Sequence, residues 1–568
     1  MYILGLTTLG NAAATLIKDG ELVAAAEEER FSRVKLHLGF PYHAVRYCLD
    51  HAGITIADVD HVSLYWKPWI LGHKAVQAAK ALTIDREMFK ARVDRGVSQV
   101  SRSYLGMLKL PRAIRSEFGA SSFRFHYLEH HECHAASAFL VSPFDRAAIL
   151  TCDGVGEATT TLMATGVGRD LHPFKRIKLP HSLGQFYSAV TNFLGFDMFA
   201  GDEWKVMGLA AYGKPEYYDF LAERVLTSTG NGEYRYNIAA LDHHLAKRYQ
   251  FPDEAVRELG PPRQPGEEIS SRHQDIAASA QKVLEDVVLS LLDHLHQKTG
   301  EENLCMAGGV ALNSVMNGRI VEESPFRRFY FQPVAGDAGC SLGAAYLTYH
   351  RLLKQPRCFV MDHAYLGPAF NSDACAAALQ RAGLGFESLP DDRLLPRVAA
   401  LLDEGAIVGW FQGRMEFGPR ALGNRSFLAD PRRPDMRQTL NRKVKMREWF
   451  RPLAPSILEE HSIELFGRTY RDPFMITVLH VLEECQATVP AVIHVDGTAR
   501  PQTVSQETNP RYWRLIREFQ HRTGVPMLLN TSFNVQEPIV CSPDDAIRTF
   551  KGADFDVLVL EDHLVLRS

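Results

Sequence analysis

Alternating apolar and polar positions near the N-terminus predict three short strands. The apolar runs YILGL, AAATLI and ELVAAAE lie within residues 2–27, separated by a turn at residues 9–11 and by Asp19-Gly20, a dipeptide typical of β-hairpins. Further along, HAVRYCLDHAG and FYSAVTNFLG carry apolar residues at the spacing of amphipathic helices. The pattern therefore predicts an α/β protein that begins with three linked strands.

The three-strand pattern recurs 146 residues later. ILGLTTLGNAAATLIKDG aligns without a gap with ILTCDGVGEATTTLMATG, with seven identities in 18 positions. Short strands rich in alanine and threonine can match by chance, but both copies lead into helical patterns, which favours an internal duplication. Two similar α/β halves with glycine-containing loops resemble the layout of the actin, Hsp70 and sugar-kinase (ASKHA) superfamily, and such loops can hold phosphate oxygens.

A third glycine loop lies in NLCMAGGVALNSVMNGRI, residues 303–320. An apolar strand is followed by Gly308-Gly309 and by the start of a helix, whose backbone N–H groups favour an anion. Paired glycines often only turn the chain, so this signal is weak by itself.

Length and composition narrow the class of protein. A chain of 568 residues exceeds the size of a single hydrophobic core, so two or more domains are expected. The net charge of -4 gives no overall attraction to nucleic acid or to an anionic membrane. No signal peptide or bilayer-spanning apolar stretch is evident, which predicts a cytoplasmic protein. Nine scattered cysteines without a CxxC pair indicate neither a disulfide framework nor a zinc ribbon.

Histidines concentrate in HHECHAASAF, residues 130–139. In a helix, His130 and His134 share one face and can reach one ion, whereas His131 points elsewhere. Asp153 ends an apolar strand and Asp337 lies in a glycine-punctuated loop, and two His with two Asp suit Fe(II), Mn(II), Co(II) or Zn(II). Isolated His pairs are more often ordinary hydrogen-bonded residues. A zincin motif is excluded, because the second His comes one position too early for HExxH.

Cationic residues concentrate between Gly413 and Arg451, where eleven Lys/Arg accompany four Asp/Glu. The local charge of +7 leaves -11 on the remainder of the chain. Arginine suits a bidentate grip on phosphate or carboxylate, and Pro419 with several glycines suggests loops that aim guanidinium groups inward. The pattern by itself fits a pocket for a small anion, a nucleic-acid surface or an ordinary solvated surface.

Taken together, the motifs resemble one family, the natural-product O-carbamoyltransferases of the NodU/CmcH type, which includes nebramycin 5′ synthase. They span nearly the whole chain in the family order, and as a set they are specific. The resemblance is carried by DGELVAAAEEERFSRVK, HHECHAASAF, TCDGVGE, GDEWKVMGLAAYGKPE, AGGVALNS, GDAGCSLGAA, GRMEFGPRALGNRS, VKMREWFRPLAPS, HVDGTARPQTV and NTSFNVQEPIV.

This resemblance implies two domains with separate chemistry. Residues 1–362 would form a duplicated ASKHA domain similar to threonylcarbamoyltransferases, and residues 363–568 a YrdC-like α/β domain. The YrdC-like domain would make carbamoyl-adenylate from carbamoyl phosphate and ATP, and the first domain would transfer the carbamoyl group to a hydroxyl of a secondary metabolite. The expected cofactors are Fe(II) or another divalent metal, with ATP as a substrate carrying Mg(II). The expected partners are these substrates and a small-molecule acceptor, without nucleic acid or membrane; a homodimer stays open.

The resemblance also assigns residues to these roles. The metal ligands are His130, His134, Asp153 and Asp337. The carbamoyl phosphate ligands are Arg420, Lys445, Arg451, Arg500, Asn530 and Ser532, of which Arg420 and Lys445 also count as catalytic. The adenylate contacts are Gly308, Gly309 and Asn313.

One departure from the family concerns the acceptor. The family usually carries His-Asp after the first strand, where this chain has Gly10-Asn11, and glycine cannot deprotonate a hydroxyl. Asp202 in GDEWK is a candidate for the base, although it could equally be an N-cap or a loop anchor. The apolar segment 61–93 suggests a bulky apolar acceptor such as a macrolide or polyketide, but buried core explains the same residues.

Three alternatives remain from sequence alone. A tRNA threonylcarbamoyl-type modification enzyme shares both folds but would need a surface that follows RNA phosphates. An ATP-dependent chaperone or regulator of the actin-like class leaves the arginine-rich segment and the His/Asp set unexplained. A metallohydrolase explains the His/Asp set but not the arginines.

Overall fold

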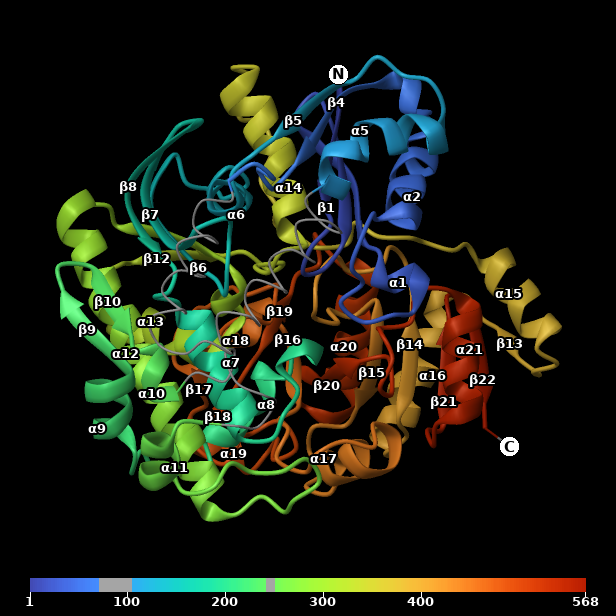
Figure 1. Ribbon diagram of the computed structural model, residues 1–568. Helices are drawn as coiled ribbons and strands as arrows, with labels where there is room; N and C mark the ends of the chain where they lie inside the picture. Colours follow the sequence, from blue (N-terminus) through green and yellow to red (C-terminus); the bar gives the residue numbers. More distant parts are fainter. Residues whose placement is uncertain (71–104, 242–250, 568) are drawn as a thin grey trace. The chain divides into compact units, whose positions relative to one another are not determined.

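The computed structural model describes residues 1–70, 105–241 and 251–567 (Figure 1). Contacts divide the chain into two compact units. Unit 1 comprises residues 1–28 and 36–361, and unit 2 comprises residues 29–35 and 362–568. The main boundary between the two units follows residue 361, whereas the sequence suggested a boundary after residue 362. The short segment 29–35 also belongs to unit 2, which the sequence did not indicate.

Unit 1 contains two five-stranded sheets of the same topology. The first has the order β3-β2-β1-β4-β5 and the second β12-β11-β6-β7-β8. In each sheet, the first three strands in chain order form antiparallel pairs. The fourth and fifth strands in chain order run parallel to the first. The strands of the first sheet are β1 (Tyr2–Thr7), β2 (Ala13–Lys18), β3 (Glu21–Glu27), β4 (Val59–Leu64) and β5 (Arg124–Tyr127). Those of the second are β6 (Arg146–Cys152), β7 (Thr159–Val167), β8 (Asp170–Lys178), β11 (Asn303–Ala307) and β12 (Arg328–Phe331).

This shared topology confirms the internal duplication. The 146-residue shift places β1 on β6 and β2 on β7, as the sequence predicted. The predicted hairpin between β2 and β3 is also present, with positive φ angles of 51° at Asp19 and 91° at Gly20. The helices predicted after each copy are α2 (Tyr42–Ala52) and α7 (Leu183–Phe193).

Two short helices lie between the sheets of unit 1. Helix α14 (Gly339–Tyr346) packs against both β1 and α6 (His130–Phe139), as Figure 1 shows. Small residues allow this approach: a Cβ atom at Gly343 would lie 1.9 Å from the carbonyl oxygen of Cys133, and one at Gly5 would lie 1.9 Å from that of Ser341. The loop that precedes α14 is therefore held beside the start of α6.

The remaining helices of unit 1 lie around the sheets. The longest is α12 (Ser271–Thr299), which contacts both α7 and α8 (Glu203–Ala210). Among the described residues of unit 1, the others of at least seven residues are α5 (Leu105–Phe118), α11 (Asp253–Leu259) and α13 (Ser314–Glu323).

Unit 2 is built on one mixed eight-stranded sheet with the order β13-β22-β21-β14-β15-β20-β16-β19. β14 pairs parallel to β21 and β16 parallel to β19, whereas the other neighbours are antiparallel. Its strands are β13 (Glu387–Ser388), β14 (Val408–Phe411), β15 (Arg425–Ala429), β16 (Ala454–Leu458), β19 (Gln502–Val504), β20 (Met527–Ser532), β21 (Val557–Leu560) and β22 (His563–Leu566). Its main helices are α15 (Ser372–Arg381), α16 (Asp391–Asp403), α20 (Pro510–Thr523) and α21 (Pro543–Gly552).

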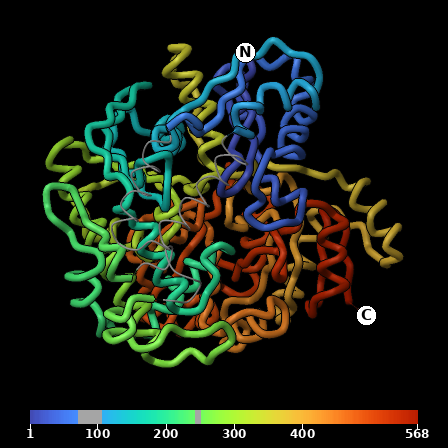
Figure 2. The backbone as a smooth tube through the Cα atoms, viewed as in Figure 1, coloured from blue at the N-terminus to red at the C-terminus, as the bar shows by residue number. Residues whose placement is uncertain are grey.

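The segment 29–35 is tied to unit 2 by its arginines. Arg30 donates from Nη2 to the carbonyl oxygen of Gly418 at 2.7 Å, and its side chain is only 4% exposed. Arg33 donates to the carbonyl oxygen of Ile539 at 2.7 Å and lies 3.6 Å from the carboxylate of Asp545. Figure 2 draws the backbone of this segment in blue, the colour of the N-terminal part of the chain. Unit 2 therefore includes residues from near both ends of the chain.

Two further features concern the apolar helices and the cysteines. Within the described ranges, no helix has both the length and the apolar character needed to cross a membrane. All nine cysteines are free thiols, and seven of them are buried.

Candidate metal centre and anion-binding cluster

Helix α6 carries the two predicted imidazole ligands. The carboxylate of Glu129 caps its N-terminus by accepting from the backbone N–H of Glu132 at 2.7 Å. His130 and His134 are both fully buried, and their Nε2 atoms lie 3.0 Å apart. His131 points away, with Nδ1 at 2.7 Å from the hydroxyl of Thr151. The helical spacing predicted from the sequence is therefore confirmed.

The two predicted carboxylates meet these imidazoles. Asp153 directly follows β6, and its Oδ2 lies 3.1 Å from Nε2 of His130 and 3.7 Å from that of His134. Asp337, before α14, places Oδ1 at 3.7 Å and 3.9 Å from the same two nitrogens. All four ligand atoms lie within 4.8 Å of one another. Residues separated by up to 207 positions thus form one buried donor set.

Neighbouring groups orient the carboxylates. The backbone N–H of Gly309 donates to Oδ1 of Asp153 at 2.9 Å, which leaves Oδ2 facing the imidazoles. The hydroxyl of Tyr65 donates to the carbonyl oxygen of Leu9 at 2.6 Å and lies 3.3 Å from Oδ2 of Asp337. Such outer contacts are typical of metal sites, where they fix the direction of each ligand.

The electrostatics of the donor set fit a divalent ion. Burial, helped by the neighbouring His134, lowers the pKa of His130 to about 4, so its imidazole is neutral and can coordinate at neutral pH. Burial and the negative charge of Asp153 raise the pKa of Asp337 well above its ordinary value. A dication between the two carboxylates would offset their repulsion. The group His130, His134, Asp153 and Asp337 could therefore hold a metal with mixed N/O ligation.

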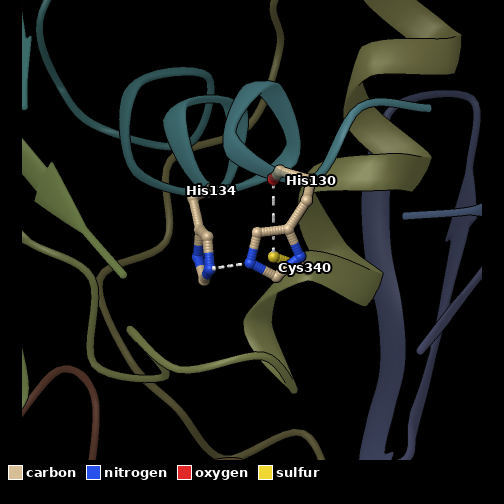
Figure 3. Close-up of side chains that lie close together, drawn as sticks. All are labelled: His130, His134 and Cys340. Atoms are coloured by element: carbon tan, nitrogen blue, oxygen red, sulfur yellow. Dashed lines mark hydrogen bonds between the residues drawn. The ribbon is translucent and has the colours of Figure 1, made fainter. Parts of the chain in front are cut away.

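A thiol also lies close to the two histidines. Cys340 on α14 faces His130 and His134 in Figure 3, and ligand atoms of these three residues fall within 4.8 Å of one another. Its Sγ donates to the backbone carbonyl oxygen of His130 at 3.9 Å. Burial raises the pKa of this thiol well above its ordinary value, which favours the protonated form over a thiolate ligand. The carboxylate set is thus the better donor group.

The predicted adenylate residues lie close to Asp153 or in the core. Gly308 has φ 93°, and a Cβ there would lie 2.1 Å from the carbonyl oxygen of Cys152. Asn313 caps α13, and its amide exchanges two hydrogen bonds with Gln281 at 2.9 and 3.0 Å. The side-chain amide of Asn313 is therefore occupied within the protein, and the nucleotide role of this loop stays a prediction.

Asp202, the predicted base, precedes helix α8. Its Oδ2 lies 2.9 Å from Nζ of Lys205 and accepts from the backbone N–H of Asp197 at 3.1 Å. These are the contacts of a loop anchor, which the sequence also allowed. The catalytic role of Asp202 stays a prediction.

In unit 2, Lys445 is the most enclosed of the predicted cationic phosphate ligands. Its side chain is nearly inaccessible, and Nζ donates to the backbone oxygen of Ser532 at 2.6 Å, to the Ser532 hydroxyl at 3.0 Å and to Oδ1 of Asn534 at 2.6 Å. All three acceptors are neutral. Burial, followed by the charges of Arg447 and Arg451, lowers the pKa of Lys445 well below its ordinary value.

Arginines add further positive charge around this lysine. Burial holds the pKa of Arg500 well below its ordinary value, and the charges of Arg420, Arg447 and Arg451 lower it further. Asp472 acts in the opposite direction, but burial raises its own pKa to about 6. The cations therefore exceed the carboxylates around them, and such an arrangement is stabilised by a bound anion. Arg447 was not singled out from the sequence, where it is one of eleven cations.

The two neutral predicted ligands lie at the end of β20. The Asn530 amide donates to the hydroxyl of Ser456 at 2.9 Å and to the carbonyl oxygen of Ala421 at 3.1 Å, next to Arg420 in the chain. The hydroxyl of Ser532 donates to Oδ1 of Asn534 at 2.7 Å. Asn530 and Ser532 thus adjoin the Arg420 loop and Lys445, respectively. The apolar segment 61–93, which the sequence linked to the acceptor, lies outside the described residues from residue 71 onward, and its acceptor role stays a prediction.

The fold and these two clusters describe a two-unit α/β protein with a buried N/O donor set in unit 1 and an excess of cations in unit 2. Family models agree: "Carbamoyltransferase N-terminus" matches residues 2–346 and "Carbamoyltransferase C-terminus" matches residues 399–567. The chain therefore belongs to the carbamoyltransferase family, which confirms the resemblance found in its motifs. Membership implies a carbamoyl donor and an acceptor substrate.

Relatives extend over nearly the whole chain. The nodulation protein NolNO of Sinorhizobium fredii is 38% identical over 571 residues, covering 98% of this chain and 79% of that protein. Nodulation protein U of the same species is 28% identical over 561 residues and covers 94% of each chain.

Two solved structures are similar at a lower level. Component A of (R)-2-hydroxyglutaryl-CoA dehydratase from Acidaminococcus fermentans matches 62% of this chain and 99% of its own, with 14% identity and a TM-score of 0.34. HypF from T. kodakarensis matches 62% of this chain and 48% of its own, with 16% identity and a TM-score of 0.32. The duplication in unit 1 rests on its own strand order and not on these similarities.

Proposed function

We propose that this carbamoyltransferase activates carbamoyl phosphate with ATP and transfers the carbamoyl group to a hydroxyl of a secondary metabolite. Water removes the phosphoryl group as inorganic phosphate, and the carbamate oxygen attacks the α-phosphorus of ATP, so that pyrophosphate leaves and carbamoyl-adenylate forms. The acceptor oxygen then attacks the carbamoyl carbon, and AMP leaves. The YrdC-like assignment of unit 2 and the threonylcarbamoyltransferase-like assignment of unit 1 belong to this proposal.

The observation that carries the proposal is the excess of partly buried cations around the buried Lys445 in a carbamoyltransferase. Carbamoyl phosphate and the pyrophosphate chain are small, strongly charged anions, and desolvated guanidinium groups bind them with charge-assisted hydrogen bonds. In the first step, Arg420, Lys445 and Arg500 would stabilise the negative charge that develops on the departing phosphate. Arg451, Asn530 and Ser532 complete the proposed set of ligands.

The buried His/Asp set supports the transfer step. A divalent ion, Fe(II) by family resemblance, would act there as a Lewis acid toward the phosphate of the adenylate. His130 and His134 would hold it through their neutral imidazoles, and Asp153 and Asp337 would supply negative charge. The backbone N–H of Gly309, which donates to Asp153, would keep that carboxylate aligned.

The loop after β1 provides no acceptor base at position 10. Gly10 has φ 76°, and a Cβ there would lie 2.1 Å from Oδ2 of Asp337, so this loop has no room for a side chain at position 10 as it stands. Another group must take the proton, and Asp202 is the proposed one. The proposed acceptor is a bulky apolar molecule such as a macrolide or polyketide.

The proposal is tested by incubating metal-replete protein with ATP, Mg(II) and carbamoyl phosphate in the absence of acceptor. We expect pyrophosphate release and a species with the mass of carbamoyl-AMP. A reaction without carbamoyl phosphate serves as the control for simple ATP hydrolysis. Absence of both products in protein with a full metal content would refute the activation step.

Asp202→Asn is expected to leave carbamoyl-adenylate formation intact and to slow transfer to the acceptor by roughly 10²–10⁴-fold, because the amide cannot take the hydroxyl proton. The two steps are measured separately as pyrophosphate release and carbamoylated product. Asp197→Asn, which changes a neighbouring carboxylate that caps a short turn through Phe199, is the control. Full turnover in Asp202→Asn would show that Asp202 is not the base.

A further inference from the structure

A buried thiol lies beside the two imidazoles of the candidate metal centre. Cys340 is completely buried on the first turn of α14. Its Sγ and one ring nitrogen each of His130 and His134 lie within 4.8 Å of one another, and Figure 3 shows the three side chains together. A nitrogen and a sulfur ligand of one tetrahedral ion are about 3.6 Å apart, for ion distances of about 2.1 and 2.3 Å. A small rotation of the Cys340 side chain therefore suffices to bring its sulfur to an ion held by these imidazoles.

The same imidazoles thus belong to two alternative donor sets. One set adds the carboxylates of Asp153 and Asp337, and the other adds the thiol of Cys340. Carboxylate oxygens suit hard ions such as Mn(II), whereas a sulfur ligand selects softer ions such as Zn(II) and Cd(II). The nature of the ion therefore decides which set is the better one.

The orientation of the two rings is not fixed through their second nitrogen. The Nδ1 atoms of His130 and His134 are buried, and neither has a hydrogen-bond partner among the described residues. In metal sites, a hydrogen bond at this second nitrogen normally sets the direction of the ligating imidazole. Without such a bond, the two rings are free to follow an ion toward the carboxylates or toward the thiol.

Asp337 is the carboxylate that the thiol can replace. It precedes Cys340 by three residues, and the backbone N–H of Cys340 donates to its carbonyl oxygen at 2.9 Å, so both side chains come from one turn. Its Oδ1 lies 3.7 Å from Nε2 of His130, whereas Oδ2 of Asp153 lies 3.1 Å from the same atom. Asp153 is also fixed by the backbone N–H of Gly309. Asp337 is therefore the looser carboxylate of the set.

We propose that Cys340 is an alternative metal ligand, and that His130, His134 and Cys340 hold soft divalent ions such as Cd(II) or Zn(II) in competition with the ion of the His/Asp set. This inference rests on the metal-binding role proposed for the two imidazoles. On binding, the S–H bond breaks, a sulfur–metal bond forms and the proton passes to the buffer. Burial raises the pKa of the thiol in the ion-free protein, but a coordinated dication deprotonates a thiol outright. The competing interpretation is that Cys340 only secures α6 through the carbonyl oxygen of His130.

The test compares Cd(II) with Mn(II) as probes of the full-length protein. Cys358 and Cys485 are first replaced by serine in the parent, because they are not buried and can bind Cd(II) themselves. The readouts are the near-ultraviolet charge-transfer absorption of a Cd(II)–thiolate bond and the rise of Tm with each ion. We expect Cd(II) to produce this absorption in the parent and to displace bound Mn(II).

Cys340→Ser is expected to lose the charge-transfer absorption and to bind Cd(II) at least about 10-fold more weakly, while its affinity for Mn(II) changes less than about 3-fold. Cys133→Ser is the matched control, because it changes another completely buried thiol that belongs to neither donor set, and it should keep the absorption. A merely structural role of Cys340 would lower the Tm of the ion-free protein and leave the absorption in place. If Cys340→Ser does not fold, Cys340→Ala is measured in the same way.

The outcomes separate this inference from the proposed function. No Cd(II)–thiolate absorption in the parent, or parental absorption in Cys340→Ser and Cys340→Ala, would overturn the role of Cys340 alone. Asp337→Asn is expected to weaken Mn(II) binding and to keep the absorption, as two separate donor sets require. Failure of the parent to bind Mn(II) or Fe(II), with the absorption present, would refute the His/Asp metal site and leave the thiol set in place.

Discussion

Arg420→Ala is expected to reduce carbamoyl-adenylate formation by roughly 10²–10³-fold, the effect of removing a group that stabilises developing negative charge. Burial lowers the pKa of Arg420 to about 10 and the charge of Asp472 opposes this decrease, so the guanidinium stays protonated near neutral pH. Its loss leaves the departing phosphate without one of its cations. The measurement is pyrophosphate release from ATP and carbamoyl phosphate without acceptor.

The matched control for Arg420→Ala is Lys443→Ala, which removes an exposed cation from the same arginine-rich segment. It is expected to release pyrophosphate at the parental rate. The metal content of both variants should equal that of the parent, because the His/Asp ligands belong to unit 1. Parental pyrophosphate release in folded Arg420→Ala would contradict the assignment of this arginine.

His134→Gln is expected to weaken metal binding by roughly 100-fold or more, because it removes one of four direct ligands. Loss of an outer-shell partner alone can cost roughly 100-fold in metal affinity. Transfer to the acceptor should fall with the metal content, whereas adenylate formation in unit 2 should persist. Elemental analysis of the purified protein gives the metal content independently of activity. The rise of Tm on adding Fe(II) anaerobically gives the affinity in a second way.

Two further variants make this result specific. Asp337→Asn keeps the size of the side chain and is also expected to lose metal, because the amide removes negative charge from the set. His131→Asn changes the third histidine of α6, which contacts Thr151 outside the set, and should retain metal. Equal metal content in the parent, His134→Gln and Asp337→Asn would exclude the His/Asp set as the metal site.

The sequence was informative wherever a feature depends on local spacing. Strand periodicity and the Asp19-Gly20 turn predicted the first three strands, and the ungapped repeat predicted that β6 and β7 would copy β1 and β2. The four-residue interval between His130 and His134 was sufficient to place both imidazoles on one face of α6. Family motifs then linked these residues to Asp153 and Asp337 over long sequence separations.

Other features depended on contacts that no local pattern encodes. The arginine-rich segment presents Arg442, Lys443, Lys445 and Arg447 as equivalent cations, yet the first two are exposed while Lys445 is buried and Asn441 fixes Arg447. Likewise, nothing in residues 29–35 indicated that they belong to unit 2. The sequence also did not predict the contacts of Asp202 with its neighbours Lys205 and Asp197.

What the sequence by itself determined is therefore the set of elements, the duplication, the family and the identity of the donor residues, because periodicity and motif spacing are properties of neighbouring positions. What only the tertiary structure decided is which of these side chains share a site and which stay in solvent. Close packing of α14 on α6, made possible by Gly343, brings Asp337 to the imidazoles, and the hydrogen bond to Asn441 together with partial burial distinguishes Arg447 from the exposed Arg442. Desolvation depends on the surrounding chain, and it would strengthen the attraction between these charges and an ion.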